Sequence, residues 1–109
     1  MKNYSNYLAK KLVKFTKKEI IISEHALIRI EQRQLDINEI KENITNPIRL
    51  KYAFKQQSKH HDEEKFNCYF DYSKNLCHRY SIIVKDRVIV VTAIKINRKW
   101  RHKVYKKIS

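Results

Sequence analysis

The hydrophobic pattern of this 109-residue chain changes its period once, near Asn46 and Pro47. Before this point apolar residues recur every three or four positions, the spacing of helices that bury one face. After it they recur at every second position, as in strands that bury one face. Because helices come first and strands follow, the chain predicts an α+β domain with its helices packed on one face of a sheet. A chain of this length forms a single domain, residues 1–109.

Three helices are expected before Pro47. The first covers residues 3–18, where the apolar positions have helical spacing, and the run "EIIIS" then continues as a strand or as an extended lead-in. Ser23 can cap the second helix, residues 24–34. The positions expected to face the core are Tyr4, Leu8, Leu12 and Phe15 in the first helix and Ala26, Leu27 and Ile30 in the second.

The third helix is expected to begin at Asp36. Glu39 follows three residues later, which predicts a capping box with Asp36 as the cap. Ile37, Ile40 and Ile44 form the buried stripe of this helix. Pro47 ends it, because the residue before a proline is pushed out of the helical region.

Four strands are expected after Pro47, joined by short polar connections that predict a four-stranded antiparallel meander. In the first of them Ile48, Leu50, Tyr52 and Phe54 alternate with polar positions and are expected to share one face. The basic C-terminal tail is either a short helix or a continued strand. The second sheet face is expected to be open, basic and aromatic, a surface suited to RNA. The expected strands are residues 48–54, 66–72, 77–84 and 88–94.

The charge balance points to an anionic partner. Lys and Arg number 25 against 11 Asp and Glu, which gives a formal net charge of +14 and a pI near 9.9. Such an excess repels itself in the folded state, so nucleic acid is the leading partner, RNA or DNA. The alternative is a soluble basic protein without such a partner. A membrane surface is not expected, because no segment combines a basic face with a strongly apolar one.

Several kinds of site are excluded or disfavoured by composition. The chain has no glycine, which excludes the Gly-rich phosphate loops of dinucleotide and P-loop proteins. Cys68 and Cys77 lack metal-ligand spacing and are expected to be buried thiols. We therefore expect neither a cofactor nor a metal. No signal peptide and no stretch of transmembrane length is seen, so the expected compartment is the cytoplasm.

The stretch "SEHALIRIEQRQLDINEIKENITNP" resembles the opening of the DUF4258 family, and "RYSIIVKDRVIVVTAIKINRKWR" resembles its closing hairpin. The likeness covers about residues 20–105, which makes residues 19–105 a family-like core after an N-terminal helix within residues 1–18. Gln34 stands where the family usually has glycine, so the helix cap is expected to be made differently here. The matching positions are His25, Ala26, Arg29, Arg33, Leu35, Ile40, Asn46 and Pro47.

The DUF4258 family is similar to the RelE-like toxins and to small RNases such as the colicin D and colicin E5 tRNases. What the resemblance implies is a RelE-like domain that cleaves RNA on its sheet face without a metal. It also implies an acidic antitoxin or immunity protein as a partner. Arg79 with Tyr80 resembles the Arg-Tyr pair that starts an inner strand in related toxins.

Cleavage of this type needs a general base, a general acid and cations around the phosphorane. His suits both proton roles near neutral pH, and Arg suits the phosphorane. The catalytic candidates are His25, Arg29, Arg79, His102 and Tyr105. For His25 and Arg29 the alternative is an ordinary solvated helix face.

Nucleic-acid contact is expected mainly in the tail, where cations alternate with aromatic residues. The alternative is that Trp100 and Val104 pack the tail onto the core while the cations only aid solubility. We also expect the helix face of His25, Arg29 and Arg33 to point toward the same groove as the tail. The binding candidates are Arg33, Arg98, Lys99, Trp100, Arg101, Lys103, Lys106 and Lys107.

The remaining histidines are expected to be ordinary surface or half-exposed residues. His78 lies beside Arg79 on a strand and is expected on the opposite face, as a half-exposed residue. His60 and His61 fall in a polar loop without metal-ligand spacing.

Two functional hypotheses remain open from the sequence. One is a metal-independent endoribonuclease of the toxin type, and the other is a non-catalytic RNA- or DNA-binding protein on the same fold. A weaker third is a module whose cationic face inhibits an acidic protein. Convergence of His25, Arg79, His102 and Tyr105 would favour the enzyme, and their separation would favour the binding protein.

Overall fold

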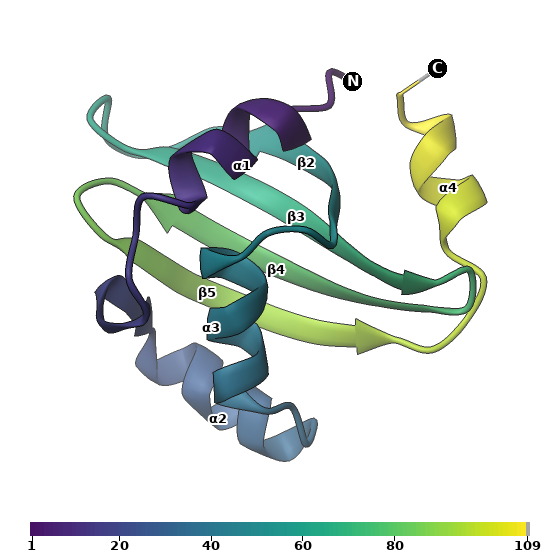
Figure 1. Cartoon of the computed structure of the whole chain (residues 1–109), viewed down its shortest axis with the longest axis horizontal. Helices are drawn as coiled ribbons and strands as arrows, with labels where there is room; N and C mark the ends of the chain where they lie inside the picture. The colour runs from purple at the N-terminus through teal and green to yellow at the C-terminus, as the bar shows by residue number, and fades with distance from the viewer. Residues whose placement is uncertain (109) are drawn as a thin grey trace.

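The computed structural model describes residues 1–108 and shows an α+β fold, with four α-helices and one five-stranded mixed sheet in this part of the chain (Figure 1). As the change of period predicts, the chain is mainly helical before Pro47 and mainly strand after it. The elements, in chain order, are α1 (Ser5–Leu12), the 3-10 turn η1 (Lys17–Glu19), β1 (Ile20–Ile22), α2 (Glu24–Gln32), α3 (Ile37–Thr45), β2 (Leu50–Gln56), β3 (Glu64–Ser73), β4 (Leu76–Val84), β5 (Val88–Ile96) and α4 (Arg101–Lys106).

The sheet has the strand order β1-β5-β4-β3-β2. Strands β2 to β5 form the predicted antiparallel meander, with each strand paired to the next along the chain. The prediction of four strands is wrong, because the run Ile20–Ile22 adds β1 as a fifth strand, parallel to β5. A parallel partner is reached by a long crossover. Here the crossover is most of the domain, so short connections in the sequence cannot reveal it.

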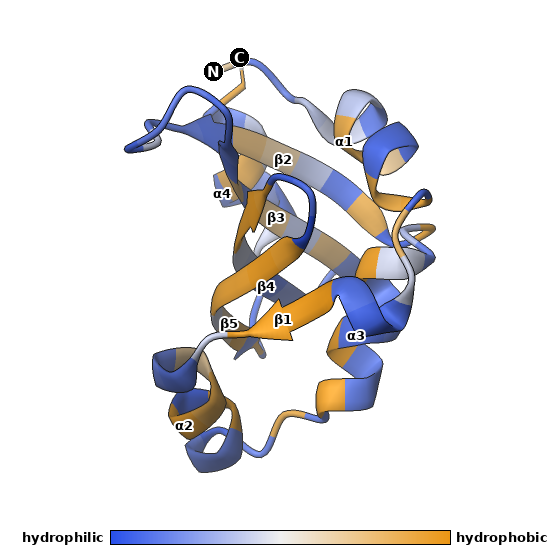
Figure 2. Cartoon of the chain, turned by 90° about the vertical axis from the view of Figure 1, so that its left-hand side faces the viewer, coloured by the Kyte–Doolittle hydropathy of each residue, from blue (hydrophilic) through white to orange (hydrophobic). Residues whose placement is uncertain are grey.

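Helices α1, α2 and α3 contribute to one hydrophobic core with the sheet face that we call the first face. Their buried residues include Leu8, Ile30 and Ile44, which join Phe66 and Val90 of the sheet in this core. Figure 2 shows hydrophobic stripes on α1 and α3, interrupted by hydrophilic residues, as expected for helices that lie on a sheet.

The first helix is shorter than the predicted residues 3–18. It ends at Leu12, and the chain then turns through η1 before β1. Leu8 and Leu12 are fully buried, whereas Tyr4 and Phe15 pack on the core only partly. The spacing of apolar residues therefore located the buried face correctly and overestimated the length of the helix.

Helix α2 begins as predicted, because Ser23 Oγ accepts a hydrogen bond from the backbone N–H of Ala26 at 3.1 Å. Ala26 and Ile30 are buried. The expectation that Leu27 faces the core is wrong, since it is 44% exposed. Ala26 and Ile30, one turn apart, are sufficient to pack this short helix on the core. Leu27 follows Ala26 by one residue and so lies on a neighbouring, exposed face of the helix.

Gln34 closes α2 in the left-handed conformation, with φ of 56°. The Leu35 N–H donates to Ile30 O at 3.0 Å and the Gln34 N–H donates to Glu31 O at 3.2 Å. These two bonds form a Schellman cap. The expectation of a different cap is therefore wrong: Gln34 adopts the conformation in which glycine is usual, and its Cβ makes that conformation unfavourable.

Replacing Gln34 with glycine is expected to raise the free energy of unfolding by about 0.5–1 kcal/mol, because relief of the Cβ clash exceeds the added entropy of the unfolded chain. Urea unfolding followed by circular dichroism measures the change. The matched control is Gln32→Gly inside the same helix, which is expected to lower stability by about 1 kcal/mol. If Gln34→Gly lowered stability as Gln32→Gly does, the left-handed conformation assigned to Gln34 would be contradicted.

The start of α3 is confirmed at Asp36, whose Oδ1 accepts from the Asn38 N–H at 2.9 Å. The capping box is not formed, because the Glu39 carboxylate instead accepts a hydrogen bond from the Tyr72 hydroxyl at 2.7 Å. The helix ends before Pro47, as predicted. A tertiary contact has thus replaced the local one.

Strand β2 departs from the predicted alternation. A bulge between Leu50 and Tyr52 shifts the register, so that Leu50 and Ala53 pack toward the first face while Tyr52 and Phe54 lie on the opposite side. Ile48 precedes the strand and is 82% exposed. Because a bulge adds one residue to one strand, strict alternation fails across it.

The opposite side of the sheet, which we call the second face, bears α4. A second hydrophobic cluster lies there, formed by Tyr52, Phe54, Tyr69, Cys77, Trp100 and Val104. Within the described part of the tail, Arg101–Lys106 forms a short helix, the first of the two alternatives. The second face is partly covered, and its aromatic side chains lie beneath α4 and are not open to solvent.

Candidate nucleic-acid interface

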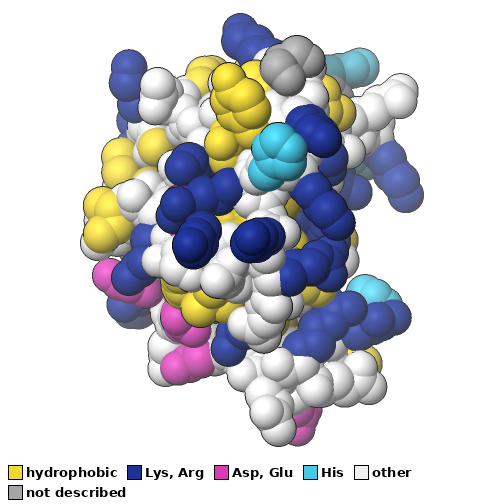
Figure 3. Space-filling view, turned by 90° about the vertical axis from the view of Figure 1, so that its right-hand side faces the viewer, with side chains coloured by type: hydrophobic (Ala, Val, Ile, Leu, Met, Phe, Trp, Pro, Cys, Tyr) yellow, Lys and Arg dark blue, Asp and Glu magenta, His cyan; other side chains and the backbone are white. Residues whose placement is uncertain are grey.

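Five exposed cations lie on α4, on the residue that ends it and on the segment that leads into it. We call them the basic surface: Arg98, Lys99, Lys103, Lys106 and Lys107. Figure 3 views this side of the molecule and shows Lys and Arg side chains gathered over it, with acidic side chains toward the left and lower margins. The chain has no Asp or Glu after Asp86. The positive charge of this segment therefore has no acidic neighbour along the chain.

Trp100 fixes the basic surface in place. Its Nε1 donates a hydrogen bond to Ser73 O at 2.7 Å, and its ring stacks on Tyr69 with centroids 6.0 Å apart. Tyr52 meets the Trp100 ring edge-on at 6.1 Å. Trp100 is only 3% exposed, so the expectation that its ring contacts bases is not met. It serves as the anchor that turns the cations of α4 outward.

Arg101 has a different environment from the other cations of the tail. Its Nη2 lies 2.8 Å from Asp71 Oδ1, in an ion pair, and Lys51 Nζ lies 3.5 Å from the other carboxylate oxygen. Arg98, Lys99 and Lys103 form no ion pair with any of the described residues. These three are accordingly available to an external anion. Tyr105, at 58% exposed, offers an aromatic ring beside them.

The candidate catalytic residues separate into two groups. Arg79 lies opposite Tyr69 in the β3–β4 register, which places it on the second face, and His102 and Tyr105 are exposed on α4 at the same side. His25 and Arg29 are exposed on α2, which packs into the core of the first face. The expected common groove is therefore not formed, because α2 and α4 pack on opposite sides of the sheet.

Arg33 has a structural partner. Its Nη1 donates to Ala93 O at 2.9 Å, on a part of β5 that extends beyond the short strand β1. The arginine thus satisfies a backbone carbonyl on the exposed edge of β5 and ties the end of α2 to the sheet.

A buried chain of polar groups lies beneath α3 and was not found from the sequence. Asn43 Nδ2 donates to the hydroxyl oxygens of both Tyr72 and Tyr80, at 2.9 Å each. His78 Nδ1 lies 2.6 Å from the Tyr80 hydroxyl. The Tyr72 hydroxyl donates to Glu39, as described above. Because Asn43 supplies hydrogens to both hydroxyl oxygens, the hydrogen of Tyr80 is directed to His78 Nδ1, which requires a neutral imidazole.

His78 lies on the opposite face from Arg79, as predicted, but it is 1% exposed and not half-exposed. Burial lowers the pKa of His78, and the charges of Lys95 and Arg49 lower it further, against the opposing effect of Glu39. Burial also raises the pKa of the Tyr80 and Tyr72 hydroxyls. These shifts favour the neutral forms of the His78 imidazole and of the Tyr80 and Tyr72 hydroxyls.

Stability is expected to fall as the pH drops below about 6.5, the ordinary pKa of histidine. In the folded protein the pKa of His78 is lowered, so the unfolded chain binds the proton more readily and acid favours unfolding. Urea unfolding at pH 7.5 and pH 5.5 measures the loss of unfolding free energy, and this loss should be smaller in His78→Gln. The control is His25→Gln, at an exposed position. An equally reduced loss in both variants would contradict the assignment of the effect to His78.

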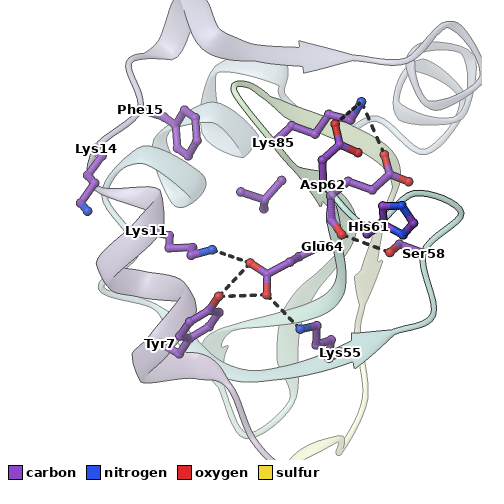
Figure 4. Close-up of a pocket in the computed structure, with 12 residues that line it drawn as sticks. Tyr7, Lys11, Lys14, Phe15, Lys55, Ser58, His61, Asp62, Glu64 and Lys85 are labelled. Carbon is purple, nitrogen blue, oxygen red and sulfur yellow. Dashed lines mark hydrogen bonds and ion pairs between the residues drawn. The ribbon is translucent and has the colours of Figure 1, made fainter.

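A second feature is a cavity of about 690 Å³ between α1 and the loop before β3 (Figure 4). The Glu64 carboxylate lies at its centre, with Lys11, Lys55 and Tyr7 turned toward it. Burial alone raises the pKa of Glu64, but hydrogen bonds from these three groups outweigh it and lower the pKa to about 2. The lysines nearest this carboxylate are thus neutralised internally, so the cavity makes a poor anion site.

The cysteines and the loop histidines do not form a site in the described part of the chain. Cys68 and Cys77 are buried free thiols, as predicted, and burial raises the pKa of Cys77 to about 12. His60 and His61 are exposed in the loop before β3. Among residues 1–108 no group of three or more His, Cys, Asp or Glu side chains is placed to hold a metal ion.

Comparisons with known proteins add no relative: no family model, no curated protein and no solved structure matches the chain. The resemblance to DUF4258 therefore stays a prediction. No helix within residues 1–108 has the length and hydrophobicity of a membrane span.

Proposed function

We propose that the protein binds single-stranded nucleic acid through the basic surface, with RNA as the leading candidate. The observation that carries this proposal is the set of exposed cations on α4 and its leading segment, without an acidic residue after Asp86. Holding these charges together opposes folding through their mutual repulsion. Contact with phosphates relieves that repulsion and releases the counterions of the nucleic acid, which drives binding.

The binding role is favoured over the catalytic one by the placement of the candidate residues. His25 and Arg29 lie on α2, away from the side of the sheet that bears α4. Cleavage remains a second candidate, because Arg79, His102 and Tyr105 lie on one side of the sheet. In that case the 2′-hydroxyl would lose its proton and attack the adjacent phosphorus, and the P–O5′ bond would break to give a 2′,3′-cyclic phosphate and a 5′-hydroxyl that takes up a proton. His102 and Tyr105 are the groups available for the two proton transfers.

Two assays on the same protein test these roles. Fluorescence anisotropy with a labelled single-stranded RNA is expected to give a Kd of about micromolar or tighter at low salt. Incubation of total RNA in EDTA, followed by mapping of strand ends, tests cleavage and is expected to leave the RNA intact. Cuts that are lost in the His102→Ala variant would show that the protein is an endoribonuclease. Binding to an acidic protein but not to RNA would instead favour an inhibitor of that protein.

A further inference from the structure

A second cavity, of about 520 Å³, lies where β2 and β3 meet the start of α4. Its lining includes three cations, Arg49, Lys51 and Arg101, together with Asp71 and Tyr72. Arg101 belongs to α4, so this pocket is continuous with the helix that carries the basic surface. The sequence does not reveal it, because its cations come from two distant segments, one with Arg49 and Lys51 and the other with Arg101.

The cations of this pocket are held in position before any ligand arrives. Asp71 is paired to Arg101 and Lys51, and its backbone carbonyl accepts from Arg49 Nη1 at 3.4 Å. The Arg49 guanidinium also lies over the Tyr72 ring, 4.2 Å from its centroid. Positioning of this kind reduces the ordering that a ligand must otherwise impose, which strengthens binding.

Donor groups remain after these contacts are made. A guanidinium has five N–H groups, and Arg101 Nε is a buried donor without a hydrogen-bond partner among the described residues. The Tyr72 hydroxyl, in contrast, already donates to Glu39 and accepts from Asn43. Tyr72 is therefore a wall of the pocket that positions Arg49, and the available donors are those of the cations.

The charges of the lining select the class of ligand. Three cations and one carboxylate leave an excess of two positive charges in the pocket. A phosphodiester in the middle of a strand carries one negative charge, whereas a phosphomonoester carries about 1.5 to 2 at neutral pH. Arginine suits such a group because its N–H fork matches the geometry of phosphate oxygens.

We propose that this pocket binds a terminal phosphomonoester of the strand that lies on the basic surface, an inference that rests on the proposed nucleic-acid function. The protein would then distinguish strands by the chemistry of their ends. The same chemistry occurs in free nucleotides, so the experiment must separate the two sources.

The experiment compares three labelled RNAs of one sequence, with a 5′-phosphate, a 3′-phosphate or hydroxyls at both ends, by fluorescence anisotropy. One phosphorylated RNA is expected to bind about tenfold more tightly than the hydroxyl form. Arg49→Ala should abolish the difference, and Lys51→Ala serves if that variant does not fold. The matched control is Arg87→Ala, at an exposed turn outside the pocket, which should preserve it.

Each outcome separates the inference from the function on which it rests. Equally tight binding of all three RNAs, or a phosphate preference that survives in Arg49→Ala, would overturn the pocket and leave the proposed function intact. Absence of binding by every RNA would overturn both. A nucleoside monophosphate is expected to compete at least tenfold more weakly than the phosphorylated RNA. Equal affinity would assign the pocket to free nucleotides and refute recognition of strand ends.

Discussion

Replacing Asn43 with alanine is expected to lower the free energy of unfolding by about 2–3 kcal/mol. The substitution removes the donor of two hydrogen bonds, a buried one to the Tyr80 hydroxyl oxygen and a partly buried one to the Tyr72 hydroxyl oxygen. The Tyr80 oxygen then loses a partner in the buried core, and the smaller side chain leaves a void beside it. Urea unfolding at neutral pH measures the change.

The control for this prediction is Asn38→Ala on the same helix, whose exposed side chain should change stability by less than about 0.5 kcal/mol. A double-mutant cycle with Tyr80→Phe tests the contact itself. The two changes should be non-additive by about 1 kcal/mol, because both remove the same bond. Equal effects of Asn43→Ala and Asn38→Ala would show that the polar chain contributes nothing measurable to the fold.

Replacing Arg98, Lys99 and Lys103 together with alanine is expected to weaken RNA binding about 100-fold at 100 mM salt. Each lost phosphate contact removes about 0.7 from the exponent that relates affinity to salt concentration, so three contacts at 0.1 M correspond to about two orders of magnitude. Fluorescence anisotropy with a hydroxyl-ended RNA measures the loss. The three side chains are exposed and form no ion pair within residues 1–108, so the fold should be preserved.

The matched control replaces Lys10, Lys14 and Lys18 with alanine. These lysines are exposed near α1, which packs on the first face, and they form no ion pair in the described part of the chain. This variant loses the same net charge, yet its affinity should fall by less than about tenfold. An equal loss in both variants would mean that net charge drives binding and that the basic surface has no special part in it.

Local patterns in the sequence were sufficient for most of the secondary structure. The spacing of Leu8 and Leu12, the cap at Ser23 and the break at Pro47 each act within one turn of the chain, so they can be read directly. The meander was also predictable, because short polar connections join strands that neighbour each other in sequence.

Features that depend on distant segments could not be read in the same way. The pairing of Ile20–Ile22 with β5 joins segments separated by most of the domain. The Glu39 carboxylate accepts a hydrogen bond from the Tyr72 hydroxyl and does not form the capping box, which the local motif cannot show. The conformation of Gln34 was missed for another reason: tertiary packing of Leu35 outweighs a conformational preference that the residue type alone expresses.

The candidate site was predictable in its charge and not in its geometry. The cations of the tail were visible as a run, but the burial of Trp100 depends on Tyr69 and Ser73 of another strand pair. The pocket that includes Arg49 and Arg101 brings together two arginines from opposite ends of the sheet-forming segment. A signal that could have found it is Asp71, the one acid in the aromatic run of residues 66–72, because a carboxylate that folding partly buries requires a cationic partner.

The salt dependence of RNA binding tests the central proposal most directly. Affinity for a hydroxyl-ended single-stranded RNA is measured between about 50 and 300 mM NaCl, for the unaltered protein and for the Arg98, Lys99 and Lys103 alanine variant. About five phosphate contacts predict a log–log slope near −3.5 for the unaltered protein and near −1.5 for the variant. An affinity that does not change with salt, or the same slope for both proteins, would contradict binding through the basic surface.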